Sequence, residues 1–277
     1  MPSSSSVGQA AREALSTARR LPAPPLRGAS EVVVAACPGG EAPASTLYLA
    51  LRHAGVRAVR AGCVEAAVHI LPYTEGGEVV VAFTGGGRDS HLMHLANAAS
   101  ALGVALHAYG PPLHPAYADQ YAELGGEYQV VGGDHLLALM VAAILWAPKP
   151  WGPRASRIGE ELEALPGSGE WLESTLPELL HAVARGVEVA AYTPSTEAGA
   201  MYLLARGAAQ SVAPLHLAPT MRGRRVLAVY TSVEEHAYRQ AILAAKLRGA
   251  DVAEARLNTE PLTASIYIAL AAHARPP

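Results

Sequence analysis

The chain has 277 residues, of which 51% are hydrophobic and 16% are charged, and its formal net charge is −3. This composition excludes an intrinsically disordered chain, and the charge balance offers no basic surface for nucleic acid or for an anionic membrane. The longest apolar run, residues 136–146, is too short to span a bilayer and predicts a buried helix. We therefore expect a soluble, cytoplasmic α/β protein without nucleic-acid or membrane partners.

The first half of the chain alternates short apolar strands with helical stretches. Residues 7–20 predict an amphipathic leader helix, and the prolines that follow it end the helix. The β-branched runs at 32–37 and 79–83 are typical of strands buried on both faces of a parallel sheet. We expect further strands at 56–60, 104–109 and 128–131, and helices at 43–54, 64–71, 89–102, 116–124 and 135–146.

The Pro-rich segment 148–153 predicts a boundary in the middle of the chain. Two helical patterns follow it, and the strand–helix alternation then resumes. The sequence predicts strands at 187–192, 215–218, 226–230 and 250–256, and helices at 157–165, 170–185, 197–209, 233–248 and 261–273.

Strand–loop–helix units repeated in this way require right-handed crossovers and a parallel sheet covered by helices. We therefore predict two α/β lobes, each a mostly parallel sheet sandwiched between helices in three αβα layers. The first covers residues 29–150 and the second, shorter lobe covers 186–277. Residues 1–28 form a leader helix and linker, and residues 151–185 form a helical connector.

Two loops of the first half have the composition of an anion site. Ligands of open α/β sheets bind at the carboxyl ends of the strands, where the strand order reverses. Glycines there let backbone N–H groups turn toward an anion, hydroxyls add donors, and a guanidinium suits phosphate oxygens. The candidate phosphate- and sugar-binding residues are Gly39, Gly40, Thr84, Gly85, Gly86, Gly87, Arg88 and Ser90. Tight turns alone would explain one such loop, but two on neighbouring strands favour a phosphate-sized anion.

The order of elements, these two loops and the closing segment 262–269 resemble the sugar isomerase (SIS) domain family. Within it, the two-domain phosphoglucose/phosphomannose isomerases are the most similar. The resemblance implies a phosphosugar-binding fold, a phosphorylated sugar as ligand, aldose–ketose isomerisation as the reaction, and a homodimer.

The sequence departs from the family at the loops and at the catalytic positions. Segments 37–41 and 83–90 stand where the family has G-x-G-G-S and S-x-S-G-x-T. The catalytic glutamate, histidine and terminal lysine of the family are not retained in ungapped register, since the comparable stretches read Ala208-Ala209-Gln210 and Pro219-Thr220-Met221-Arg222-Gly223. These departures leave open a non-catalytic phosphosugar sensor or structural relative.

Glu197 is the candidate base and His216 the candidate ring-opening acid, although neither comes from a matched family motif. Glu197 could equally be a capping carboxylate at a helix start. His216, placed in a short apolar strand, could equally be a hydrogen-bonded core residue. Glu234 is interpreted as part of an ordinary capped helix start.

Two cysteines, Cys37 and Cys63, exclude a disulfide scaffold and a thiolate metal cage. We interpret Cys37 as a small buried hydrophobic residue. His91 and His94 share one predicted helix but lack a carboxylate at metal-ligand spacing, so we expect neither a metal nor another cofactor.

Overall fold

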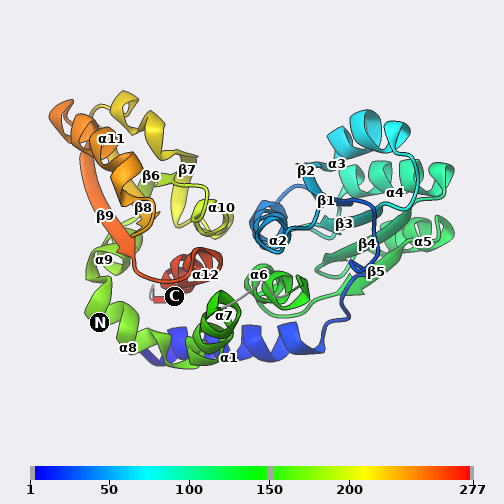
Figure 1. Cartoon of the computed structure of the whole chain (residues 1–277), viewed down its shortest axis with the longest axis horizontal. Coiled ribbons are helices and arrows are strands. Elements are labelled where there is room, and N and C mark those ends of the chain that lie inside the picture. The colour runs from blue at the N-terminus through cyan, green and yellow to red at the C-terminus, as the bar shows by residue number, and fades with distance from the viewer. Residues whose placement is uncertain (1–3, 149–152, 275–277) are drawn as a thin grey trace. The chain divides into compact units, whose positions relative to one another are not determined.

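The computed structural model describes residues 4–148 and 153–274, and it divides into two compact units (Figure 1). We call Ala14–Trp151 the first lobe, and Met1–Glu13 together with Gly152–Pro277 the second lobe. Helix α1 (Ser4–Arg20) contributes residues to both. Residues 149–152 of the predicted Pro-rich boundary lie outside the described residues, and the domain limits given above stay a prediction.

The first lobe contains a five-stranded parallel sheet with the order β2-β1-β3-β4-β5. Helices α2 and α6 lie on one face of the sheet, and α3, α4 and α5 lie on the other (Figure 1). Its elements are β1 (Val32–Ala36), α2 (Glu41–His53), β2 (Ala58–Gly62), α3 (Cys63–Glu65), the π-helical η1 (Ala66–Ile70), the 3₁₀ helix η2 (Leu71–Tyr73), β3 (Val79–Phe83), α4 (Ser90–Leu102), β4 (Ala105–Gly110), α5 (Pro115–Glu123), β5 (Glu127–Val130) and α6 (His135–Trp146).

The central strands β1 and β3 explain why their sequences are continuously apolar. Both are buried almost throughout, because helices cover both faces of the sheet. Val33 and Val80 point into a core shared with α4, whereas their strand neighbours point to the opposite face. Helix α6 is buried along most of its length, as the apolar run predicts.

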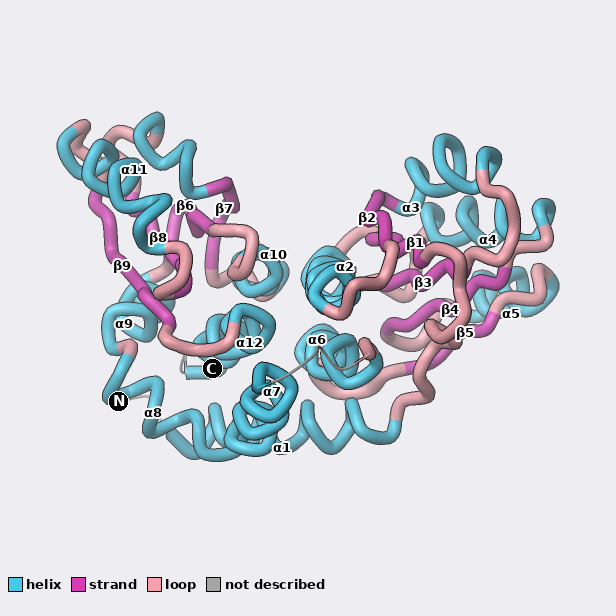
Figure 2. The backbone as a smooth tube through the Cα atoms, viewed as in Figure 1, coloured by secondary structure: helices cyan, strands magenta, loops and turns pink. Residues whose placement is uncertain are grey.

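The second lobe contains a four-stranded parallel sheet with the order β7-β6-β8-β9 (Figure 2). Residues of β6 and β8 pack with η4 and α11 in one core cluster, while α10 and α12 contact each other. The elements are α7 (Pro153–Ala164), η3 (Leu165–Gly167), α8 (Ser168–Thr175), α9 (Pro177–Arg185), β6 (Val187–Tyr192), α10 (Glu197–Ala205), β7 (Ala209–Pro214), η4 (Leu215–Thr220), β8 (Arg225–Thr231), α11 (Glu235–Leu247), β9 (Asp251–Leu257), α12 (Pro261–Ala271) and η5 (Ala272–Ala274). The predicted fold, two parallel sheets flanked by helices, is confirmed.

One predicted strand is wrong, and the bounds of the neighbouring helix differ from the prediction as well. Residues 215–218 form part of a 3₁₀ helix, and the strand lies just before it at Ala209–Pro214. Leu215 and Ala218 are buried while the two residues between them are exposed, which is the period of three of a 3₁₀ helix and not the period of two of a strand. Helix α10 ends earlier than predicted because Gly207, with φ +65°, turns the chain away.

No helix within residues 4–148 and 153–274 combines the length and apolar character needed to cross a membrane.

Candidate functional site

The carboxyl ends of β1 and β3 form the switch point of the first lobe. The strand order reverses between these two neighbours, because β2 lies beyond β1 and β4 lies beyond β3. This is the position at which open α/β sheets bind ligands. Both predicted loops start there, one after β1 and one after β3, and each leads into a helix.

The glycines of these loops allow two backbones to approach closely. Gly85 N–H donates to the carbonyl of Pro38 at 3.1 Å, which ties the second loop to the first. A Cβ on Gly40 would lie 2.1 Å from the carbonyl oxygen of Phe83, and one on Gly85 would lie 2.7 Å from Gly39 Cα. No side chain fits at either position, so close packing accounts for these glycines.

Three of the amides predicted to hold an anion already donate within the protein. Gly40 N–H donates to Cys37 O at 2.8 Å, Gly85 N–H to Pro38 O, and Gly86 N–H to Thr84 Oγ1 at 3.3 Å. The loop is also anchored on its far side, where His114 N–H donates to Gly87 O at 2.7 Å. These bonds fix the shape of the loop but reduce the number of amides available to a ligand.

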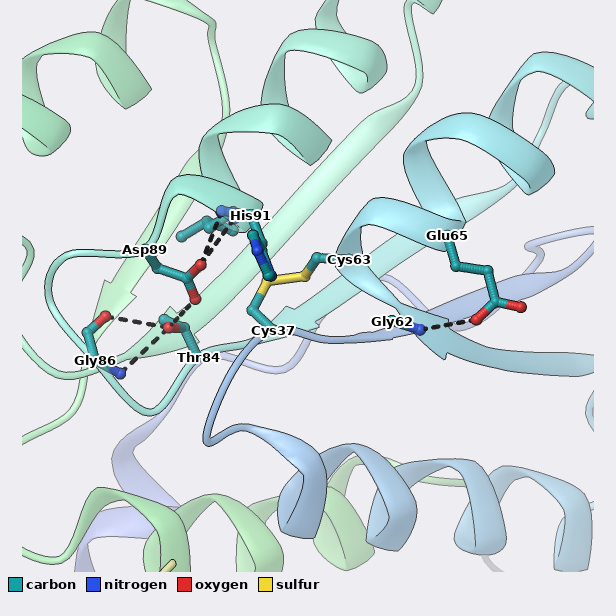
Figure 3. Close-up of a disulfide and its surroundings, with 9 residues drawn as sticks. Cys37, Gly62, Cys63, Glu65, Thr84, Gly86, Asp89 and His91 are labelled. Atoms are coloured by element: carbon teal, nitrogen blue, oxygen red, sulfur yellow. Dashed lines mark hydrogen bonds between the residues drawn. A yellow bond between two sulfur atoms is a disulfide. The ribbon is translucent and has the colours of Figure 1, made fainter.

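Thr84 is wholly buried, and its hydroxyl donates to the carboxylate of Asp89 at 2.5 Å (Figure 3). The same carboxylate accepts from the amides of His91 and Leu92 at 3.0 and 3.1 Å, so Asp89 caps the N terminus of α4. Thr84 is therefore placed at the predicted site but holds the loop together. Sequence reasoning assigned Asp89 only to the start of a helix, and an Asp directly before an apolar-periodic segment was the available signal for the cap.

Arg88 and Ser90 stand on either side of Asp89 and are both exposed. Ser90 is the first residue of α4, so its hydroxyl lies at the positive end of the helix dipole. No described residue forms an ion pair with Arg88. Of the predicted side chains, these two are free to meet a ligand from solvent.

Cys37 is a buried core residue, as predicted, but it is not a free cysteine. Cys37 forms a disulfide bond with Cys63, joining the carboxyl end of β1 to that of β2 (Figure 3). Both residues are buried, at 0% and 1% exposure. The sequence does not reveal the pairing because the cysteines are 26 positions apart, and only the parallel alignment of β1 with β2 brings them together. Disulfides persist mainly in oxidising compartments and in intracellular proteins of hyperthermophiles. The bond is therefore unusual for a cytoplasmic protein, and the cytoplasmic location stays a prediction.

The candidate catalytic residues follow adjacent strands of the second sheet. Glu197 is the first residue of α10, after β6, and is half-buried. His216 follows β7 but lies in the 3₁₀ helix η4 with an exposed side chain. His216 is thus not on a strand, contrary to the prediction, and its exposed side chain rules out the alternative of a core residue.

Glu234 is a residue whose position the sequence analysis missed. Its carboxylate accepts hydrogen bonds from Thr193 and Ser195, after β6, and from Thr231, at the end of β8. The Thr231-x-x-Glu234 spacing indicated a local cap. The contacts with the loop after β6 depend on the pairing of β6 with β8 and have no local signal.

Within the described part of the chain, no group of three His, Cys, Asp or Glu side chains is arranged to hold a metal ion. His91 and His94 are both exposed on α4.

No protein-family model and no curated protein matches this sequence. Solved structures do share its fold. Glucosamine-6-phosphate deaminase from Thermotoga maritima aligns with a TM-score of 0.69 and 12% identity, covering 98% of this chain and 92% of that one. A Bacillus subtilis protein assigned as a phosphosugar isomerase aligns with a TM-score of 0.65 and 11% identity over 96% and 92%.

The C-terminal domain of glucosamine-fructose-6-phosphate aminotransferase from Francisella tularensis aligns with a TM-score of 0.62 and 10% identity, covering 98% of this chain and 91% of that domain. Identities this low establish the fold alone. The structural likeness expected from the resemblance to SIS-domain proteins is confirmed.

Proposed function

We propose that the protein binds a phosphorylated sugar at the switch point of the first lobe. The observation that carries the proposal is the exposed pair Arg88 and Ser90 at the N terminus of α4, at the carboxyl ends of β1 and β3. Proteins of the same fold over at least 96% of this chain include two whose names contain a phosphorylated sugar.

The phosphate is held by the Arg88 guanidinium and the Ser90 hydroxyl, with the N–H of Gly87 as a backbone donor. A guanidinium and phosphate oxygens form paired, charge-assisted hydrogen bonds. The Asp89 carboxylate lies between these groups in sequence but is 5% exposed and accepts three internal hydrogen bonds. The hydrogen-bonding capacity of its oxygens is therefore used within the loop.

Isothermal titration tests this binding with fructose 6-phosphate and glucose 6-phosphate, and with the unphosphorylated sugars as ligand controls. Arg88→Ala should weaken binding of the phosphorylated sugars about tenfold or more, since it removes a charge-assisted bond. Arg52→Ala is the matched control, because Arg52 is an exposed arginine in the last turn of α2 in the same lobe. Absence of heat and of any thermal shift at millimolar sugar phosphate would contradict the proposal.

The finer proposal is aldose–ketose isomerisation of the glucose/mannose 6-phosphate to fructose 6-phosphate type. It requires a base that moves a proton between C2 and C1 and an acid that opens the ring. Glu197 is the proposed base and His216 the proposed acid. Both belong to the second lobe, so this finer proposal is separate from the proposed phosphate site of the first lobe. A coupled assay for glucose 6-phosphate formed from fructose 6-phosphate measures turnover, and Glu197→Gln should lower it about 10²–10⁴-fold with binding intact. Glu235→Gln, at the start of α11, is the control.

One observation favours the alternative of a non-catalytic phosphosugar sensor. His216 is exposed on a 3₁₀ helix, whereas an efficient proton donor is held in position by its surroundings. The sensor alternative expects measurable sugar-phosphate binding and no turnover in the same two assays.

A homodimer is part of the proposed function. Leu243 and Leu247 lie one turn apart on α11 with 57% and 79% of their surface exposed, which is an apolar strip suited to a partner. Sedimentation should give twice the mass of the chain, and a monomer at micromolar concentration would contradict this part.

A further inference from the structure

The carboxylate of Glu234 is bound by the chain much as a small anion would be. One oxygen, Oε2, accepts from the hydroxyl of Thr193 at 2.6 Å and from the hydroxyl and amide of Thr231 at 2.8 and 3.3 Å. The other oxygen, Oε1, accepts from the amide of Ser195 at 3.2 Å. Two hydroxyl and two amide donors therefore converge on one carboxylate.

These donors lie where the second sheet would bind a ligand. The order β7-β6-β8-β9 reverses between β6 and β8, so the carboxyl ends of these two strands form the switch point of the second lobe. Thr193 and Ser195 belong to the loop after β6, and Thr231 is the last residue of β8. Glu234 thus occupies the position that corresponds topologically to the predicted anion site of the first lobe.

Helix capping explains only half of this arrangement. A capping box at Thr231-x-x-Glu234 requires the glutamate to accept from Thr231 alone. The donors Thr193 and Ser195 lie about 40 residues earlier, with sequence separations of 41 and 39. They are 0% and 8% exposed, and Thr231 is 0% exposed. Buried donors need an acceptor, and Glu234 supplies it for both loops.

We propose that the loops after β6 and β8 form an oxyanion-binding site whose occupant is the protein's own Glu234 carboxylate. In the wild-type chain this side chain closes the site to external anions. Without it, the same donors bind a small free oxyanion, either a carboxylate such as acetate or inorganic phosphate. The inference concerns the second lobe and does not depend on sugar-phosphate binding by the first.

A phenol that stays neutral adjoins the Glu234 carboxylate. Tyr238 is one turn further along α11, and its pKa is raised by burial and, to a smaller extent, by the Glu234 carboxylate. The site holds the carboxylate by neutral donors, so an external anion should bind in the millimolar range and not more tightly.

Chemical rescue of Glu234→Ala tests the site. The variant should unfold several degrees below the wild type, because four donors lose their acceptor. Added acetate or phosphate should then raise its melting temperature in a saturable way, as expected for a ligand that binds only the folded state. Sodium chloride at matched ionic strength should not. Saturation by acetate alone supports a site for planar carboxylates, and saturation by phosphate supports one that also admits tetrahedral oxyanions.

Two controls separate a vacated site from general destabilisation. Glu234→Gln should be destabilised but not rescued, because the amide fills the space and presents an N–H₂ to groups that already donate. Glu235→Ala removes the neighbouring carboxylate, which pairs with Arg256 at 3.1 Å, and should show no anion-specific response. Equal rescue by chloride, or equal rescue of all three variants, overturns the proposal.

If Glu234→Ala does not fold, Glu234→Asp takes its place in the same titration. The shorter side chain withdraws the carboxylate by one methylene and leaves part of the site open, and the charge it keeps should make the saturable response weaker than that of Glu234→Ala. A lack of saturable rescue in every folded variant overturns the proposal.

Discussion

The two lobes satisfy the polar groups at their switch points in different ways. In the first lobe, glycines bring two loops into backbone contact, and a disulfide fixes the adjacent strand ends. In the second lobe, one carboxylate, that of the residue before α11, accepts hydrogen bonds from both loops. One topology leaves the same unpaired groups at the strand ends, and either steric fit or a partly buried carboxylate can order them. The stability of the first lobe should therefore fall when a side chain is added at a glycine or when the disulfide is reduced. The stability of the second lobe should respond to changes in its carboxylates.

Gly40→Ala should give the largest effect on the first lobe. The added Cβ would meet the Phe83 carbonyl oxygen at 2.1 Å, and neither atom can move without a shift of its backbone. We expect a loss of more than about 3 kcal/mol in the free energy of unfolding, measured by chemical denaturation. Gly132→Ala is the matched control, because a Cβ there meets nothing within 4 Å and should change little. Equal stability of the two variants would show that the loops are not held by close contact.

Loss of the disulfide should have the next largest effect. Closing a segment with a sequence separation of 26 stabilises the folded chain by about 3 kcal/mol, chiefly by restricting the unfolded state. The wild type should therefore denature at a lower denaturant concentration after unfolding and refolding in dithiothreitol. The double variant Cys37→Ala/Cys63→Ala should resemble the reduced protein and be indifferent to reductant. If dithiothreitol leaves the denaturation midpoint of the wild type unchanged, the disulfide does not stabilise the first lobe.

The smallest effect concerns a charged pair of the second lobe. Burial acts to raise the pKa of the Glu254 carboxyl, but hydrogen bonds from Lys246 and Tyr230 outweigh it, and the net shift is downward from 4.5. A carboxyl with a lowered folded pKa stabilises the protein above about pH 4.5, and this contribution is lost as the pH falls through the folded value.

Because Glu254 is partly exposed, solvent screening keeps the contribution below about 1 kcal/mol. Unfolding free energies between pH 3 and 6 should show a smaller acid loss for Glu254→Gln than for wild type. Glu123→Gln, an exposed glutamate on α5 of the first lobe, should retain the wild-type pH dependence.

The fold was more accessible from the sequence than the site. The β-branched runs of β1 and β3 indicated strands covered on both faces, and that pattern is local. Residues 215–218 misled because four apolar-rich residues between prolines fit either a strand or one 3₁₀ turn. The position of His216 followed from that error.

The candidate site depends on contacts between distant segments. The Gly-rich loops were found because glycine clusters are visible locally, but the reason for Gly85, contact with Gly39, is a property of the paired strands. The Cys37–Cys63 bond and the reach of Glu234 to Thr193 are of the same kind. Local sequence patterns show which residues have the chemistry for a site. Only the pairing of the strands determines which of these residues come into contact.

The division of α1 between the lobes has a consequence for synthesis on the ribosome. Its first residues belong to the second lobe, where Val7 and Ala11 are buried and the Ser6 hydroxyl donates to the carbonyl of His273 at 2.9 Å. That partner is translated more than 260 residues later, with a sequence separation of 267. The whole first lobe leaves the ribosome before that partner is made. It can fold while the apolar face at the start of α1 is still uncovered. The second lobe can therefore be completed only late, through contacts between residues far apart in the sequence. Until the segment around His273 has been synthesised, the apolar face of the first residues of α1 has no partner in the second lobe.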